Sequence, residues 1–260
     1  LLTLKVEGLL GGHSGQDIDK ERQNADLLMA RMIQRLLKET KGQLVSFNGG
    51  TKDNAIPREC EASLIYESDE EAAKAEELAC ELAETYAEEL TPAEPDFSCE
   101  ISCETNRTAE AIPQDAAKEF ICAMRLAPNG IQKRNIKMDG FVVVSLNLGV
   151  VRTEEDRIVM IFSPRSSVAS LQEDTKERLN TLAETFGFTV SHSSEYPGWS
   201  FKEDSPVREI CKESYKELFG EDLKIEAIHA GLECGLFSDA IKGLDAIAIG
   251  PTIANCHTPD

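Results

Sequence analysis

Hydrophobic and polar residues alternate with two different periods in the first part of the chain. In the segment LTLKVEG (residues 2–8) every second residue is apolar, as in a half-buried strand. Between about Lys20 and Lys38, apolar residues recur every three or four positions, which predicts a helix with one buried face. The segments GQLVSFNGG (42–50) and AIPRECEASLIYE (55–67) predict two more strands.

The next two segments complete a known order of elements. Ser68 lies three residues before Glu71 in a capping-box pattern, which predicts that a helix begins there and covers residues 68–90. The segment DFSCEISCE (96–104) then alternates as a strand does. The resulting order, strand–helix–strand–strand–helix–strand, is that of the split ferredoxin-like unit.

A similar series of elements is predicted in the second part of the chain. It consists of a helix at about 114–125, strands at 140–153 and 157–166, a helix at about 168–186 and a strand at 188–194. No residue identity recurs at a fixed spacing, so the repeat is one of pattern only. We therefore expect an α+β fold in which two ferredoxin-like half-units of the βαββαβ type, about 1–105 and 106–194, share one antiparallel sheet.

The pattern changes at SEYPGWSFKEDSP (194–206), where prolines and a glycine surround the single tryptophan and indicate a connector. The elements predicted after it are a helix at 206–219, an apolar strand ending near His229, a short helix at about 234–241 and a buried strand at 244–250. This order is of the α/β type, but the tail is too short for an α/β domain of its own. We expect residues 1–194 to form one domain and residues 195–260 to be the C-terminal segment of another.

The composition of the chain argues against some classes of binding partner and indicates its cellular compartment. The chain has 47 acidic and 27 basic residues, and its net charge of −20 argues against binding to nucleic acid. No apolar run approaches the ~20 residues that span a bilayer, and the opening LLTLKVEGLL does not have the pattern of a signal peptide. Eight cysteines without a CxxC pair are typical of a reduced, cytoplasmic protein. The chain has no initiator methionine, so we expect it to be part of a longer protein.

Two of the four histidines lie in loops beside turn-forming residues. His13 in GGHSG has neighbours with small side chains, so its ring could approach another surface and donate a hydrogen bond to an oxyanion, or it could be an ordinary turn histidine. His257 follows a strand pattern, where α/β sheets commonly bind ligands, but zinc needs at least three protein ligands and no others surround it. We expect His192 on the surface and His229 as a hydrogen-bonded core histidine.

Two polar residues next to strands are further candidates. Arg165 in FSPRSS ends a hydrophobic strand, where it could bind a carboxylate with two hydrogen bonds or form a salt bridge at the strand end. Asn54 in GGTKDNAIP lies in a glycine-led turn, where it could bind a ligand or make a local hydrogen bond. The sequence has no GxSxG, P-loop or GxGxxG motif, which leaves serine-hydrolase and nucleotide-binding functions without their signatures.

Together these segments resemble one enzyme family. GGHSGQDIDKERQNA, NAIPREC, SPRSS and HAGLECGLFSDAIKGLDAIAIGPTIANCHTPD occur in the order and spacing of the aminoacyl-histidine dipeptidases (Xaa-His dipeptidases, the bacterial carnosinase-like enzymes), which are co-catalytic zinc metallopeptidases. The resemblance covers nearly the whole chain and corresponds to the family's lid domain followed by the last part of its catalytic domain. It implies hydrolysis of small dipeptides by a water molecule that two zinc ions activate, with manganese or cobalt as substitutes, and it allows a homodimer.

The resemblance also assigns roles to individual residues. His13 resembles the lid histidine that stabilises the oxyanion, within its own subunit or across a dimer, and Asn54 resembles the lid asparagine that contacts substrate. Arg165 resembles the arginine that binds the terminal carboxylate of the substrate, and Gly231 the glycine that lines the substrate pocket. His257 in HTPD resembles the C-terminal histidine ligand of one zinc ion.

The chain departs from the family in what it lacks. The family's HxD motif, its bridging aspartate, the Glu-Glu pair with the general base and a further aspartate ligand precede the lid, and none is present here. We therefore expect these 260 residues alone to be inactive and to bind no zinc stably. Two alternatives remain: a related zinc peptidase or N-acyl amino acid deacylase with another substrate, and a non-catalytic ferredoxin-like module that self-associates.

Overall fold

The first part of the chain forms the ferredoxin-like unit that its pattern predicts. In the computed structural model, which describes residues 1–136, 140–193, 197–199, 201–226, 229 and 233–250, four strands and two long helices alternate in the order βαββαβ. These elements are β1 (Leu2–Glu7), α1 (Ala25–Glu39), β3 (Gln43–Gly49), β5 (Cys60–Ile65), α2 (Asp69–Leu90) and β6 (Ser98–Cys103). The strands lie in the order β6–β1–β5–β3 and every pairing is antiparallel.

Both helices of this unit begin at capping side chains. Asn24 accepts hydrogen bonds from the backbone N–H groups of Asp26 and Leu27, so α1 begins at Ala25, five residues later than the periodicity predicts. The side chain of Asn24 also donates to the Leu148 carbonyl, which fixes the helix start to the sheet. Ser68 caps α2 through the Glu71 N–H, as predicted.

Two short strands form a small sheet that is separate from the main sheet. The strand β2 (Gly12–His13) pairs with β4 (Ala55–Ile56), and the short helix η1 (Ile18–Lys20) follows β2. The single strand predicted over 55–67 is divided at Pro57 into β4 and β5, because proline lacks the N–H that a strand ladder needs. This small sheet brings His13 and the turn with Asn54 side by side.

The second part of the chain extends the same sheet, which confirms the predicted shared antiparallel sheet. Its elements are α3 (Gln114–Leu126), β7 (Gly130–Asn135), β8 (Phe141–Thr153), β9 (Ile158–Ser166) and α4 (Ala169–Phe186). Gly49 of β3 pairs with Val151 of β8, which joins the two parts into a seven-stranded sheet. Along one edge of β8, its residues Val144 to Thr153 pair with β9. Along the other edge, the first part of β8 pairs with β7 and a later part pairs with β3.

The element order of this second part differs from the predicted one. Residues 130–135 form the unpredicted strand β7, while the described residues 188–193 of the expected last strand form no strand. Both edges of β8 are occupied by β9, β7 and β3, and residues 188–193 do not pair with the outer edge of β9 either. They line the same cavity as β9 instead.

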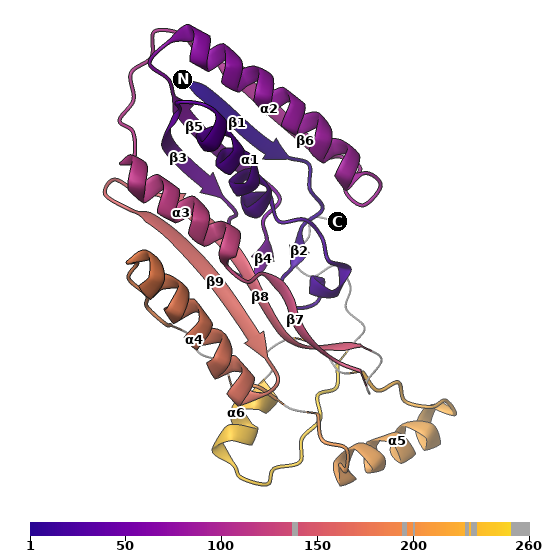
Figure 1. The fold of residues 1–260 in the computed structure, drawn as a ribbon. Helices are drawn as coiled ribbons and strands as arrows, with labels where there is room; N and C mark the ends of the chain where they lie inside the picture. The colour runs from indigo at the N-terminus through magenta and orange to yellow at the C-terminus, as the bar shows by residue number, and fades with distance from the viewer. Residues whose placement is uncertain (137–139, 194–196, 200, 227–228, 230–232, 251–260) are drawn as a thin grey trace.

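The long helices pack in one layer against the sheet. Figure 1 shows α2, α1, α3 and α4 side by side along one face of the sheet, and neighbouring pairs are in contact. The core between the two layers is apolar and contains Leu4 of β1 and Ile33 of α1, both fully buried. Phe47 of β3 and Phe120 of α3 meet edge to face, with 5.3 Å between the ring centroids, and connect the two parts of the chain.

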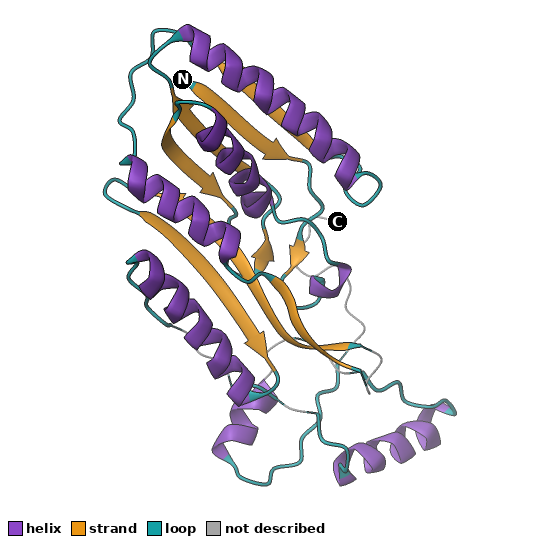
Figure 2. Cartoon of the chain, in the orientation of Figure 1, coloured by secondary structure: helices purple, strands orange, loops and turns teal. Residues whose placement is uncertain are grey.

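The C-terminal segment packs much less closely. The helices α5 (Pro206–Phe219) and α6 (Glu233–Ala240) lie at one end of the molecule, away from most of the sheet (Figure 2). The predicted strand at 244–250 is wrong, since these residues have no regular structure and Ile249 is 76% exposed. A buried strand of this kind needs neighbours on both edges, and the described residues of this segment offer none. None of the described helices is long and apolar enough to span a bilayer.

Candidate active site

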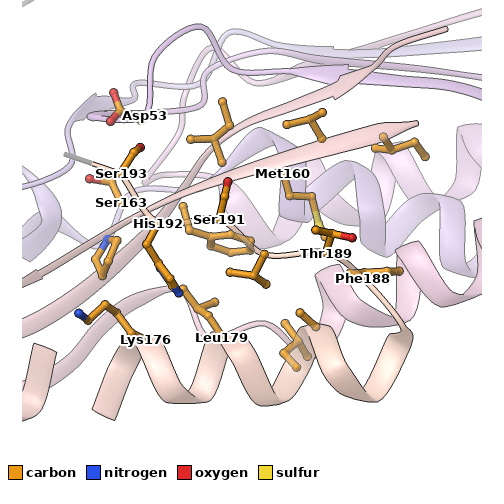
Figure 3. A pocket seen from close by; sticks show the side chains of 18 of the residues that line it. Asp53, Met160, Ser163, Lys176, Leu179, Phe188, Thr189, Ser191, His192 and Ser193 are labelled. Atoms are coloured by element: carbon orange, nitrogen blue, oxygen red, sulfur yellow. The ribbon is translucent and has the colours of Figure 1, made fainter. Parts of the chain in front are cut away.

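Asn54 and Arg165, two of the residues singled out from the sequence, line the same cavity. Its volume is about 1650 Å³, and it runs between β9, α4 and residues 188–193. Figure 3 shows this cavity from close by, with Asp53 at one end and Phe188 at the other. Asn54, Arg165 and His229 line it, together with Asp53.

A backbone hydrogen bond joins the turn that carries His13 to the turn that carries Asn54. Ser14, the residue after His13, donates its N–H to the carbonyl of Asn54 at 2.9 Å. The His13 ring is oriented by the same turn, because its Nδ1 accepts the N–H groups of Gly15 and Gln16 at 3.1 and 3.0 Å. An Nδ1 that accepts hydrogen bonds has no proton, so the neutral ring carries its proton on Nε2 as a donor.

The turn with Asn54 is fixed to the main sheet by a residue that sequence reasoning missed. Asn147 of β8 is buried, and its Nδ2 donates to the carbonyls of Asp53 and Ala55 at 3.0 and 2.8 Å. Its Oδ1 is buried without a hydrogen-bond partner among the described residues. The available signal was an asparagine inside the apolar run FVVVSLNLGVVRT, where a buried amide needs partners.

Arg165 ends β9 as a partly buried cation. Burial lowers the pKa of the guanidinium, and the carboxylate of Asp53 opposes this effect. Its Nε is buried with no hydrogen-bond partner among the described residues, and it forms no ion pair within them. The salt bridge considered as an alternative for Arg165 is therefore not present in the described part of the chain. A guanidinium with an unused donor can bind a carboxylate.

His229 lies beside this arginine, although only a core role was predicted for it. Its Nε2 lies 2.7 Å from Oγ of Ser145, and its ring meets Phe141 edge to face at a centroid distance of 6.4 Å. Burial and the charge of Arg165 together lower the pKa of the imidazole to about 4, against an opposing effect of the Val142 backbone. His229 is thus a neutral, hydrogen-bonded histidine, but it also lines the cavity.

Three further residues singled out from the sequence are Gly231, His257 and His192, and of these His192 lines the cavity. Gly231 and His257 lie outside the described residues. His192 is exposed and pairs with Asn180 of α4, as expected for a surface histidine. Within the described part of the chain, no group of three or more His, Cys, Asp or Glu is placed to hold a metal ion.

Comparisons with known proteins agree with the resemblance in the motifs. The chain is 35% identical over 263 residues to the cytosol non-specific dipeptidase of Escherichia coli (strain K12), which covers 100% of the chain and 53% of the relative. A crystal structure of aminoacylhistidine dipeptidase from Vibrio alginolyticus superposes with a TM-score of 0.85 at 34% identity, over 92% of this chain and 48% of that one. The chain thus spans about half the length of these relatives.

The first part of the chain also matches a known domain family. Residues 4–94 match the M20 peptidase dimerisation domain, and they include the helices α1 and α2. The resemblance of this chain to the aminoacyl-histidine dipeptidases is therefore confirmed, and its residues 4–94 are similar to the M20 peptidase dimerisation domain.

Proposed function

We propose that this chain is part of a metal-dependent dipeptidase that hydrolyses Xaa-His dipeptides of the carnosine type. One observation carries the proposal: Asn54 and Arg165 line one cavity, and the turn that orients the His13 ring is hydrogen-bonded to Asn54. These residues come from three separate segments of the chain, so their convergence is a property of the fold. The relatives that match are dipeptidases, which supports a peptidase function.

Each residue has a role that follows from its chemistry. The Nε2–H of His13 donates a hydrogen bond to the oxyanion that forms when the peptide carbonyl is attacked. Arg165 binds the terminal carboxylate of the dipeptide with its guanidinium. The Asn54 side chain contacts the substrate between these two groups, and Gly231 lines the pocket. Binding a short substrate at both its carboxylate and its reacting carbonyl fixes the peptide bond relative to the nucleophile.

The metal requirement belongs to the same proposal. In the intact protein, two zinc ions (or manganese or cobalt) would supply the activated water, and His257 would be one ligand. The described residues hold no cluster of ligands that fits such a centre, so we derive no step through the metal. The chain's own contribution is to bind the substrate and to stabilise the oxyanion. We expect the 260 residues alone to bind no zinc stably and to be inactive.

The exposed apolar side chains of the C-terminal segment support the proposal that the intact protein has a second domain. Large apolar side chains are exposed on α5 and beyond it: Leu218 is 77% exposed and Phe219 64%. Exposed apolar patches of this kind commonly mark a surface that another part of the protein covers. We propose that residues 1–194 form the lid, that residues 195–260 complete the catalytic domain, and that the protein is a cytoplasmic homodimer through its dimerisation domain.

Substrate specificity is tested by comparing three substrates with the intact, metal-loaded protein. We expect hydrolysis of β-Ala-His to exceed that of Ala-Ala and acetylornithine, and a chelator to abolish it. A preference for Ala-Ala or acetylornithine would favour the related peptidase or deacylase over an Xaa-His dipeptidase, as small differences in pocket contacts decide between such substrates. Activity unaffected by exhaustive removal of metal would contradict the proposal.

A further inference from the structure

His229 lies where three separate parts of the chain meet. It belongs to the C-terminal segment, yet its ring is hydrogen-bonded to Ser145 in the middle of the sheet, 84 residues earlier. Its backbone carbonyl lies against the turn that carries His13, since a Cβ built on Gly15 would come within 2.4 Å of the His229 oxygen. Contacts this close require glycine at position 15, which indicates that the two segments are packed directly on each other.

The same hydrogen bond places the ring beside Arg165. Ser145 of β8 and Arg165 of β9 are direct partners in the antiparallel register. Side chains at such opposite positions point to the same face, with their Cβ atoms about 4.5–5.5 Å apart. A ring held by the Ser145 hydroxyl is therefore next to the guanidinium, and the charge of Arg165 contributes to lowering the pKa of the imidazole.

The surroundings of His229 favour its neutral form. Burial and the charge of Arg165 lower the pKa of the imidazole, against an opposing effect of the Val142 backbone. Nε2 and the Ser145 hydroxyl share a hydrogen bond of 2.7 Å in which either group can be the donor. A neutral ring adds no charge next to Arg165.

We propose that His229 is a positioning residue, which holds Arg165 and the His13 turn in one fixed arrangement for the dipeptide. This inference rests on the proposed function and extends it. No direct contact between His229 and the substrate is required. Its ring holds the β8–β9 end through Ser145, and its backbone carbonyl holds the turn at Gly15. Loss of the ring frees Arg165 and the end of the turn to move relative to each other.

Kinetics of the intact, metal-loaded enzyme test this role. In His229→Ala we expect KM to rise roughly 10-fold with kcat less affected, about the effect of one lost hydrogen bond at a charged site. His229→Gln keeps an acceptor for the Ser145 hydroxyl and should restore most of the affinity. Ser145→Ala should match His229→Ala, and the double variant should lose no more than either one, because both remove the same hydrogen bond.

A matched control separates this effect from a general loss of stability. Ser63→Ala removes another nearly buried serine of the same sheet, whose hydroxyl bonds Thr3 at 3.1 Å. It should leave KM unchanged. Equal changes in KM in Ser63→Ala and Ser145→Ala, or unchanged KM in His229→Ala, would overturn the inference.

An NMR measurement tests the inference even if the proposed substrate is wrong. In the intact protein, His229 should be neutral at pH 7, and His13 should show an unprotonated Nδ1 and a protonated Nε2. His229→Ala should shift the backbone amide signals of Gly15 and Gln16 and the Nε–H signal of Arg165, while Ser63→Ala should not. If His229→Ala leaves these signals in place, His229 does not position them, whatever reaction the protein catalyses.

Discussion

At the residue scale, the candidate site depends on a few polar groups whose neighbours fix their state. The His13 ring presents Nε2–H because two backbone N–H groups occupy its Nδ1. Arg165 keeps an unused Nε in a buried position. These are the features that a binding site for a charged dipeptide requires: a directed neutral donor and a cation with free hydrogen-bonding capacity.

Arg165 provides the first prediction. Arg165→Lys keeps the positive charge but loses the planar fork that binds a carboxylate with two hydrogen bonds. We expect KM for a dipeptide to rise roughly 10- to 100-fold, with a smaller change in kcat. Steady-state kinetics of the intact enzyme measure this. Arg107→Lys is the matched control, since Arg107 is exposed, pairs with Glu104 and does not line the cavity. An unchanged KM in Arg165→Lys would contradict a carboxylate-binding role.

A second prediction concerns Asp26, a fully buried carboxyl group in the first turn of α1. Burial raises its pKa to about 7, even though the neighbouring Cys60 thiol lowers it, and neither carboxyl oxygen has a hydrogen-bond partner among the described residues. Because the folded pKa lies above the unfolded one, the protonated form stabilises the fold, and this stability is lost as the pH rises from about 4 to about 7.

Asp26→Asn removes this titration. We expect the variant to be more stable than the wild type at pH 8, by roughly 2–4 kcal/mol, and to lose less stability between pH 5 and pH 8. Urea unfolding at several pH values measures the difference. Parallel pH profiles of the two proteins would show that Asp26 is ionised normally in the fold.

Sequence reasoning identified several of these residues but not the ones that support them. His13, Asn54 and Arg165 stand next to glycines or at strand ends, where the local pattern already sets them apart. Ser145, Asn147 and His229 sit in apolar runs and look like core positions. Their partners lie 84 to 94 residues away in the chain, so nothing local indicates them.

At the element scale, the long strand β8 organises the site. It pairs with β9 along one edge and carries Ser145 and Asn147, which hold His229 and the Asn54 turn. Gly149 lies between them and the turn: a Cβ there would come within 2.6 Å of Asp53 backbone atoms. The turn therefore rests directly on the strand, and a side chain at this position would lift it off.

Asn147 provides the element-scale prediction. Asn147→Ala removes two hydrogen bonds to the backbone of the turn and leaves the two carbonyls of Asp53 and Ala55 without these partners. We expect a loss of about 2–4 kcal/mol in unfolding free energy, together with a higher KM. Denaturation and steady-state kinetics test the two effects. Asn129→Ala, which removes one hydrogen bond to Leu148 on the same strand, is the control and should change stability without a matching rise in KM.

The elements themselves were predicted best where the pattern is local. The order of the first unit, the caps and the helices follow from periodicity and capping residues in adjacent positions. The strand β7, with the polar sequence GIQKRN, has no alternation that marks it, and it forms because an edge of β8 is available. Residues 188–193 alternate but find no partner, which shows that strand formation depends on the neighbouring strands as well as on the sequence.

At the scale of the whole molecule, the sheet and the C-terminal segment differ in how fully they are packed. The sheet and its helices enclose an apolar core, whereas α5 has no buried residue. The predicted strand at 244–250 fails for the same reason: its partner strands are not among the described residues. The division into residues 1–194 and 195–260 stays a prediction. A further domain that covers the C-terminal segment would explain both why α5 has no buried residue and why residues 244–250 form no strand.

Self-association is predicted at this scale as well. Because residues 4–94 are similar to a peptidase dimerisation domain, we expect the intact protein to sediment as a particle of twice its chain mass at micromolar concentration. Sedimentation velocity at several concentrations measures this, with the ionic strength varied because the chain carries a net charge of −20. A single monomeric species over the whole range would contradict a homodimer.

In the proposed reaction, His13 of this chain donates the hydrogen bond that stabilises the oxyanion. The most direct test is the hydrolysis of β-Ala-His by the intact, zinc-loaded protein and by its His13→Ala variant. We expect the wild type to hydrolyse the dipeptide and the variant to lose roughly 100- to 1000-fold in kcat with KM little changed, because a donor to the oxyanion acts in the transition state. A wild type without dipeptidase activity, or a variant with unchanged kcat, would contradict the account.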